Sequence, residues 1–175
     1  MKRIFSVLCC GVLWLPAGPA QTRKTATAPA TAMTDQQFID FAAQTDMVEA
    51  NLGKLAESTA SSQQVKDYGH MLASDHTKDF HELNFVAQKL NLKVPDAIDA
   101  EHNKTMIDPF QKLKGAAFDS RYVREMIAGH TKAIAIYTRE AGEQRNPALK
   151  DYAESALPVL QKHLDNARSL EKKGK

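Results

Sequence analysis

Cysteine is almost absent from this chain of 175 residues: its only two, Cys9 and Cys10, lie side by side near the N-terminus. Their surroundings are typical of a secretory signal peptide, because two basic residues precede an apolar run over residues 4–15 and small residues follow up to Ala20. We predict a signal peptide over residues 1–20, cleaved near Ala20, and a periplasmic or otherwise exported protein. Cleavage leaves the mature chain with no disulfide and no thiolate metal ligand.

Long hydrophobic runs and an excess of one charge are also lacking. No later stretch approaches the roughly 20 apolar residues that a membrane-spanning helix needs, so we predict no span in the mature chain. The whole sequence has 23 basic and 21 acidic residues, and the predicted signal contains two basic residues and no acidic one. The mature chain is therefore neutral and gives no electrostatic reason to bind nucleic acid. The sequence is compatible with a homo-oligomer or with an envelope protein as partner.

β-Strand patterns are missing, since valine and isoleucine are sparse and nowhere alternate with polar residues at a period of two. Apolar residues instead recur at steps of three and four, the spacing of the buried face of a helix. The predicted elements are a flexible tether over 21–33, helices over 35–58, 62–91, 120–143 and 147–171, and a partly helical connector over 96–117.

The turns of the predicted fold are short within two helix pairs. Thr34 and Gln37 form a capping box for the first helix, and we expect Asp119 to cap the third helix. Short turns join the first helix to the second and the third to the fourth, which favours two antiparallel hairpins. The predicted fold class is an all-α, up-and-down four-helix bundle over residues 34–171.

Each predicted helix has one metal-competent side chain on its apolar face: Glu49, His76, His130 and His163. His130 and His163 lie at nearly equal distances from the turn that joins their helices, so we expect them to face each other. A pivot at residue 60 separates Glu49 from His76 by about 7 Å along the helix axis. This register favours Asp75 or Asp79 for the carboxylate role, as a ligand or as a residue that orients an imidazole.

Three imidazoles and a carboxylate cost several kcal/mol to bury unless they satisfy one another. One solution is a metal site, because neutral imidazole and carboxylate suit divalent zinc, iron, manganese or copper. The residues for it are His76, His130, His163, Glu49 and Asp75. The other is a dry hydrogen-bonded network with the four tyrosines, Tyr68, Tyr122, Tyr137 and Tyr152.

Both solutions make the same prediction for acid–base behaviour. Buried neutral histidines should have pKa values below the ordinary value of about 6.5. The stability of the fold should then decrease as the pH falls from about 6.5 to 5. His70, His81 and His102 lie off or beside the apolar faces, and we expect them at the surface.

The order of these residues resembles the bacterial exported family called domain of unknown function 4142, over about residues 34–171. The matching segments are Phe38–Ala42, Glu49 with Leu55 and Ala56, Val65–Lys66, Met71–His76, Gly115 with Phe118, Asp119 and Tyr122, then His130, and Leu157–Leu164. The resemblance implies a ferritin-like four-helix bundle outside the cytoplasm, and it supplies no chemistry. The chain lacks the Glu-x-x-His motif of ferritin di-iron centres, which favours a single-metal or a non-catalytic site.

Recognisable catalytic motifs are missing too: the sequence has no nucleophile elbow, no glycine-rich phosphate loop and no Cys-x-x-Cys pair. We predict no catalytic residue, and an enzyme is the least favoured class. The leading hypothesis is an exported metal-binding bundle. The alternative is a structural or interaction bundle of the cell envelope, linked to stress, whose core histidines are only hydrogen-bonded.

Overall fold

The helix starts follow from local capping chemistry. The Thr34 hydroxyl accepts a hydrogen bond from the Gln37 amide at 3.2 Å, and the Gln37 side chain accepts one from the Thr34 amide at 2.8 Å. These bonds satisfy donors that the first helical turn leaves free. At the last helix, the Asn146 side chain accepts from the Ala148 amide at 3.0 Å, and Pro147 occupies the first helical position, where no N–H is needed.

The computed structural model describes residues 33–142 and 146–173. The predicted signal peptide and nearly all of the predicted tether lie outside the described residues. The helices are α1 (Asp35–Thr59), α2 (Gln63–Lys89), α3 (Ala100–His102), η1 (Asn103–Ile107), η2 (Asp108–Phe110), α4 (Gly115–Gly142) and α5 (Pro147–Lys173). No strand occurs among the described residues.

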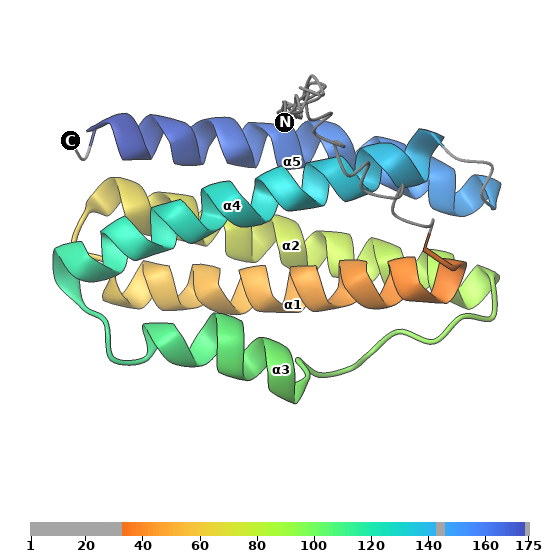
Figure 1. The fold of residues 1–175 in the computed structure, drawn as a ribbon, viewed down its shortest axis with the longest axis horizontal. Coiled ribbons are helices and arrows are strands. Elements are labelled where there is room, and N and C mark those ends of the chain that lie inside the picture. The colour runs from red at the N-terminus through yellow and green to blue at the C-terminus, as the bar shows by residue number, and fades with distance from the viewer. Residues whose placement is uncertain (1–32, 143–145, 174–175) are drawn as a thin grey trace, which may run out of the picture. The chain divides into compact units, whose positions relative to one another are not determined.

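The described residues form the all-α four-helix bundle that the periodicity predicts. α1 packs along α2, and α4 packs along α5, so the bundle consists of two hairpins (Figure 1). Contacts between the hairpins are sparser than contacts within them. The connector of α3, η1 and η2 lies beside α1 (Figure 1).

The first hairpin is held together by an unusually close helix approach at Gly53 and Gly69. A Cβ added at Gly53 would lie 2.6 Å from the Gly69 carbonyl oxygen, and one added at Gly69 would lie 2.7 Å from the Gly53 carbonyl oxygen and from the Ala56 methyl group. Only residues without a side chain allow the two backbones to come this near. This contact therefore fixes the spacing between α1 and α2.

The core consists of two apolar clusters, one toward each end of the bundle. One contains Phe38, Tyr137 and Tyr152, and the other contains Leu52 and Tyr122. Along each long helix, buried polar side chains fall between the residues of the two clusters. Near this boundary lie Asp46 and Glu49 in α1, His76 in α2, His130 in α4 and His163 in α5, whereas the buried Glu140 of α4 lies farther along, among the residues of the first cluster.

α4 begins at Gly115, earlier than the predicted start at 120, and Asp119 does not cap it. Gly115 has a φ of +61°, which lets the chain turn directly from the connector into the helix. From within α4, the Asp119 carboxylate accepts hydrogen bonds from the Ser61 amide at 2.9 Å, the Ser62 amide at 2.8 Å and the Ser61 hydroxyl at 2.7 Å. Since Ser62 makes no side-chain cap of its own, Asp119 caps α2 from the other hairpin.

Asp119→Ala should lower the free energy of unfolding by about 1–2 kcal/mol, because the Ser61 and Ser62 amides at the N-terminal boundary of α2 lose a charged acceptor. Urea unfolding followed by circular dichroism measures this change. Asp96→Ala, at an exposed position in the connector, is the control and should change the value by less than about 0.5 kcal/mol. Equal stability of the two variants would contradict the cross-hairpin cap.

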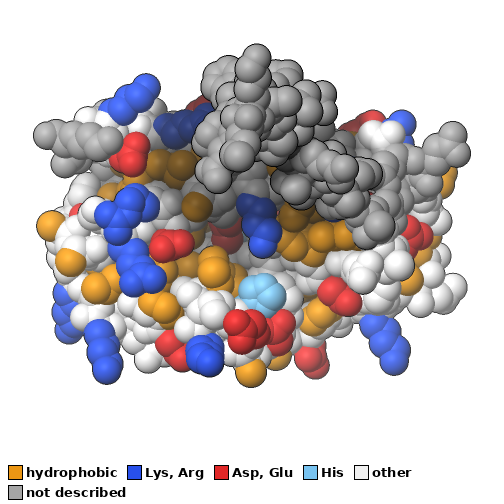
Figure 2. Space-filling view, in the orientation of Figure 1, with side chains coloured by type: hydrophobic (Ala, Val, Ile, Leu, Met, Phe, Trp, Pro, Cys, Tyr) orange, Lys and Arg blue, Asp and Glu red, His pale blue; other side chains and the backbone are white. Residues whose placement is uncertain are grey.

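One face of the bundle shows basic and acidic side chains together. On the face in Figure 2, lysine and arginine side chains lie among acidic ones. None of the helices in the described part of the chain combines the length and the apolar character that crossing a bilayer requires.

Candidate metal centre

Each long helix contributes one side chain to a single buried polar centre. Glu49 of α1, His76 of α2, His130 of α4 and His163 of α5 are 5%, 2%, 0% and 1% exposed. The centroids of the three imidazole rings are 5.2–5.8 Å apart. The helical periodicity of four separate segments thus brings together four side chains that are far apart in sequence.

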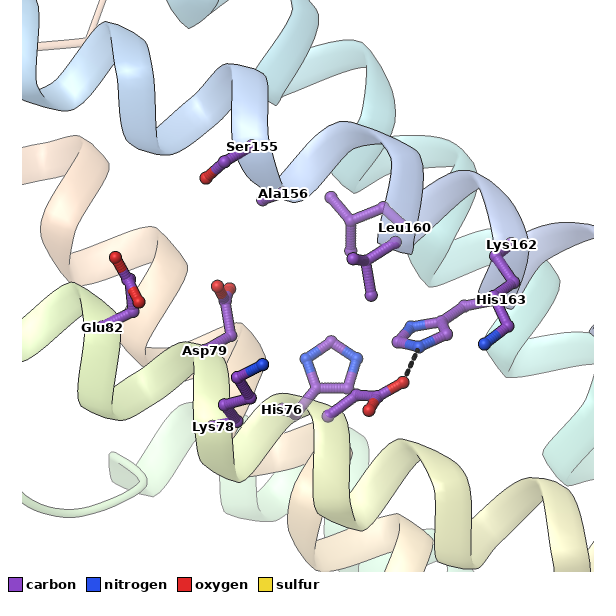
Figure 3. A pocket seen from close by; sticks show the side chains of 11 residues that line it. His76, Lys78, Asp79, Glu82, Ser155, Ala156, Leu160, Lys162 and His163 are labelled. Atoms are coloured by element: carbon purple, nitrogen blue, oxygen red, sulfur yellow. Dashed lines mark hydrogen bonds and ion pairs between the residues drawn. The ribbon is translucent and has the colours of Figure 1, made fainter.

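One nitrogen of each imidazole has a hydrogen-bond partner outside the centre. His76 Nδ1 pairs with Asp46 Oδ1 at 2.9 Å, and His163 Nε2 pairs with Asp75 Oδ2 at 2.9 Å (Figure 3). His130 Nδ1 donates to the Met126 carbonyl oxygen at 2.8 Å. These bonds fix the ring orientations, and they leave the second nitrogen of each ring facing inward.

The inward nitrogens, His76 Nε2, His130 Nε2 and His163 Nδ1, have no hydrogen-bond partner in the structure. Glu49 Oε2 lies 3.1 Å from the first and 3.2 Å from the second, but it too lacks hydrogen-bond geometry. One potential ligand atom from each of the three histidines lies within 4.8 Å of the others. Four ligands at about 2.1 Å from a tetrahedral metal are about 3.4 Å apart, so small side-chain movements would complete a coordination sphere.

The ligand set fits a divalent transition metal. A metal-bound imidazole commonly donates its other N–H to a carboxylate or a backbone carbonyl, and all three rings have such a partner. Leaving these buried nitrogen and oxygen atoms unpaired costs about 1–3 kcal/mol each. A cation among them removes that cost and offsets the charge of Glu49.

Burial and neighbouring charges move the acid–base equilibria in opposite directions. Burial lowers the pKa of His163 to about 4 and also lowers the pKa of His130. For His76, burial acts in the same direction, but Glu49 and Asp46 outweigh it and raise the pKa to about 10. Burial raises the pKa of Asp46 to about 7. The Glu49 pKa is lowered, because His130 and His76 outweigh the effect of its burial.

The sequence predicts lowered pKa values for all three histidines. This prediction is wrong for His76, whose pKa is raised because two carboxylates flank its ring. His130 and His163 favour the neutral form when folded, so their contribution is present above about pH 6.5 and is lost as the pH falls. His76 favours the charged form. Its contribution is present below about pH 6.5 and is lost as the pH rises toward 10.

In the metal-free chain, His163→Gln should therefore flatten the dependence of stability on pH between about 6.5 and 4. His76→Gln should flatten it between about 6.5 and 10. Urea midpoints across this range, with a chelator present, measure both slopes. His81→Gln, at an exposed position, should change neither, and identical curves for all three variants would contradict the buried centre.

The tyrosines do not complete the centre by hydrogen bonding. Tyr68 donates to the His163 carbonyl oxygen at 3.1 Å. Tyr152 donates to Asp79 at 2.8 Å, and its hydroxyl lies 3.4 Å from that of Tyr137. The buried Tyr122 hydroxyl has no hydrogen-bond partner. The inward imidazole nitrogens are thus left for another kind of group.

The structure corrects the predicted register of the first hairpin and assigns a position to Asp75. Glu49 is not displaced from His76, because side chains lean toward the N-terminus of their helix and this tilt brings the two together across antiparallel helices. Asp75 pairs with the outer nitrogen of His163, so it lies in an orienting position.

The sequence prediction missed Asp46, although it precedes Glu49 by one helical turn on the same face. The surface histidines His70 and His81 are exposed, as expected.

Comparison with solved structures shows the same fold in proteins of low sequence identity. The Cu(II)-bound form of CopM is 16% identical, with a TM-score of 0.67 over 83% of this chain and 100% of that chain. Its Ag-bound form is 17% identical, with a TM-score of 0.64 over 81% of this chain and 97% of that chain. A DUF305 fragment from Deinococcus radiodurans is 13% identical, with a TM-score of 0.68 over 82% of this chain and 99% of that chain. No curated protein matches the chain.

Comparison with family models gives a match over nearly the whole sequence. The model described as domain of unknown function (DUF4142) covers residues 20–170. This range includes all four long helices nearly to the end of α5 and every residue of the centre. The chain therefore belongs to the DUF4142 family.

Proposed function

We propose that this protein binds one divalent transition-metal ion outside the cytoplasm. His76, His130 and His163 are the nitrogen ligands, and Glu49 is the oxygen ligand. Asp75 and the Met126 carbonyl oxygen, together with Asp46, orient the three rings. The observation that supports the proposal is the convergence of three buried imidazole nitrogens that have no hydrogen-bond partner.

The ligand types favour zinc, iron, manganese or copper in the divalent state. Imidazole suits zinc, copper and iron, whereas soft monovalent ions prefer sulfur ligands. The four proposed ligands contain no sulfur. The forms of CopM that resemble this chain are described as Cu(II)-bound and Ag-bound, so a bundle of this shape is compatible with metal binding.

The alternative is a bundle whose histidines serve only to hold the core. The charged pairs of His76 with Asp46 and Glu49 favour it, because an imidazolium can replace a metal as the central cation. It leaves His163 Nδ1 without a hydrogen-bond partner and His130 Nε2 with only the 3.2 Å contact to Glu49 Oε2. The two functions differ in the effect of a chelator. Chelation lowers the melting temperature of a metal-binding bundle, because a bound metal stabilises the folded state by mass action. It leaves the melting temperature of a purely hydrogen-bonded core unchanged.

Metal analysis of the purified, full chain tests the proposal. We expect about one equivalent of metal after reconstitution with zinc, copper or iron, and a melting temperature that drops on chelation. His130→Ala/His163→Ala should bind none at the same concentrations. The control His70→Ala/His81→Ala alters two exposed histidines and should bind as the wild type does. A wild type that takes up none of these metals would refute the proposal.

A further inference from the structure

A cleft of about 410 Å³ lies between α2 and α5, on the side where the two hairpins meet. Its lining includes His76 and His163, two of the four proposed ligands (Figure 3). Asp75 also lines it. The inward nitrogens of both histidines lack a hydrogen-bond partner, although their side chains are at least 97% buried. The cleft thus leads from the surface to two of the residues whose inward nitrogens belong to the centre.

The charges along the cleft suit a cation. Three acidic side chains line it, Asp75, Asp79 and Glu82 of α2, and they outnumber the two basic side chains of the lining, Lys78 of α2 and Lys162 of α5. Asp75 is 35% exposed at its side chain while it holds the His163 ring. A carboxylate therefore lies at the boundary between solvent and the proposed ligands.

The opposite side of the centre is less open. A cavity of about 100 Å³ between α1 and α4 touches Glu49, and the connector contributes His102 and Met106 to its lining. The α2–α5 cleft is larger, and within the described part of the chain only α2 and α5 line it. Of the two openings, the α2–α5 cleft is therefore the wider approach to the centre.

We propose that the α2–α5 cleft is the passage through which a divalent cation enters and leaves the centre. This inference rests on the proposed function. A passage changes the rates of binding and release by the same factor, so narrowing it leaves the dissociation constant unchanged. Charges along it act mainly on the rate of association, and salt weakens their effect.

Zn²⁺ uptake and chelator-driven Zn²⁺ release, followed with a chromogenic indicator on the full chain, test the passage. Val159 is 41% exposed and lines the cleft, so Val159→Trp narrows it without altering a proposed ligand. We expect uptake and release to slow together by about tenfold, with affinity unchanged. Ser155→Trp, at a second exposed position of the same lining, should act in the same way if the first variant fails to fold.

Thr45→Trp is the matched control, because Thr45 lines the smaller α1–α4 cavity. It should leave the rates of uptake and release unchanged.

At low salt, Glu82→Gln should slow association and Lys162→Gln should accelerate it, each by about two- to fivefold. Rates that respond to Thr45→Trp and not to Val159→Trp would overturn the passage while leaving the metal site intact. A wild type that binds no Zn²⁺, Cu²⁺ or Fe²⁺ would overturn both.

Discussion

Glu49→Gln should lower the free energy of unfolding of the metal-free chain by about 3–5 kcal/mol, the effect of removing one partner from a buried ion pair. Glu49 Oε2 lies 3.1 Å from His76 Nε2, and this imidazole also faces Asp46. With a neutral amide at position 49, the charged form of His76 loses one of its two carboxylates inside a core that excludes water. Urea unfolding at pH 7 in the presence of a chelator measures the loss.

The same variant should weaken metal binding by more than the ~10–100-fold that is typical of a partner outside the ligand shell. The reason is that a carboxylate ligand is replaced by a poor, uncharged donor. Glu57→Gln is the matched control in α1, since the Glu57 side chain is 51% exposed and lies 3.3 Å from the exposed His70. It should change stability by less than about 0.5 kcal/mol and leave affinity unchanged. If both variants behave alike, Glu49 is not part of the centre.

Gly69→Ala should destabilise the bundle by about 1–3 kcal/mol, the usual effect of inserting a methyl group into a closely packed core. The new methyl would lie 2.7 Å from both the Gly53 carbonyl oxygen and the Ala56 methyl group. Backbone atoms cannot rotate away, so α1 and α2 must separate. Thermal and urea unfolding of the metal-free chain measure the change.

The separation should also reach the centre, because Glu49 and Asp46 lie on α1 and His76 lies on α2. We therefore expect Gly69→Ala to reduce metal affinity without altering any ligand. Gly142→Ala is the control, since a Cβ there meets nothing within 4 Å. Its stability should be unchanged or slightly higher. A Gly69→Ala protein with wild-type stability would mean that the two helices are not held at this distance.

The four-helix fold could be predicted from periodicity because each long helix buries one apolar face. The same periodicity predicts that His76, His130 and His163 lie inside. The predicted start of α4 at residue 120 was wrong. An aspartate before a helical segment usually caps that segment, whereas Asp119 lies within α4 and caps α2 across the bundle. A contact of this kind depends on how hairpins dock, and single-helix patterns do not contain that information.

The hydrogen-bond partners of the histidines were harder to predict than the histidines themselves. The role of Asp46 depends on a side-chain tilt and a helix stagger that sequence spacing does not specify. The opposite pKa shifts of His76 and His163 arise because one ring faces two carboxylates and the other faces one half-exposed carboxylate. Burial alone would lower the pKa of both histidines.

The distribution of the centre over two hairpins has a consequence for folding kinetics. Contacts within each hairpin are local in sequence, so they can form early, whereas contacts between the hairpins are sparse and distant in sequence. The proposed ligands are divided equally, two from α1 and α2 and two from α4 and α5. An ion bound to all four would join the hairpins only after both have formed. Its removal should then accelerate unfolding while leaving the refolding rate nearly unchanged.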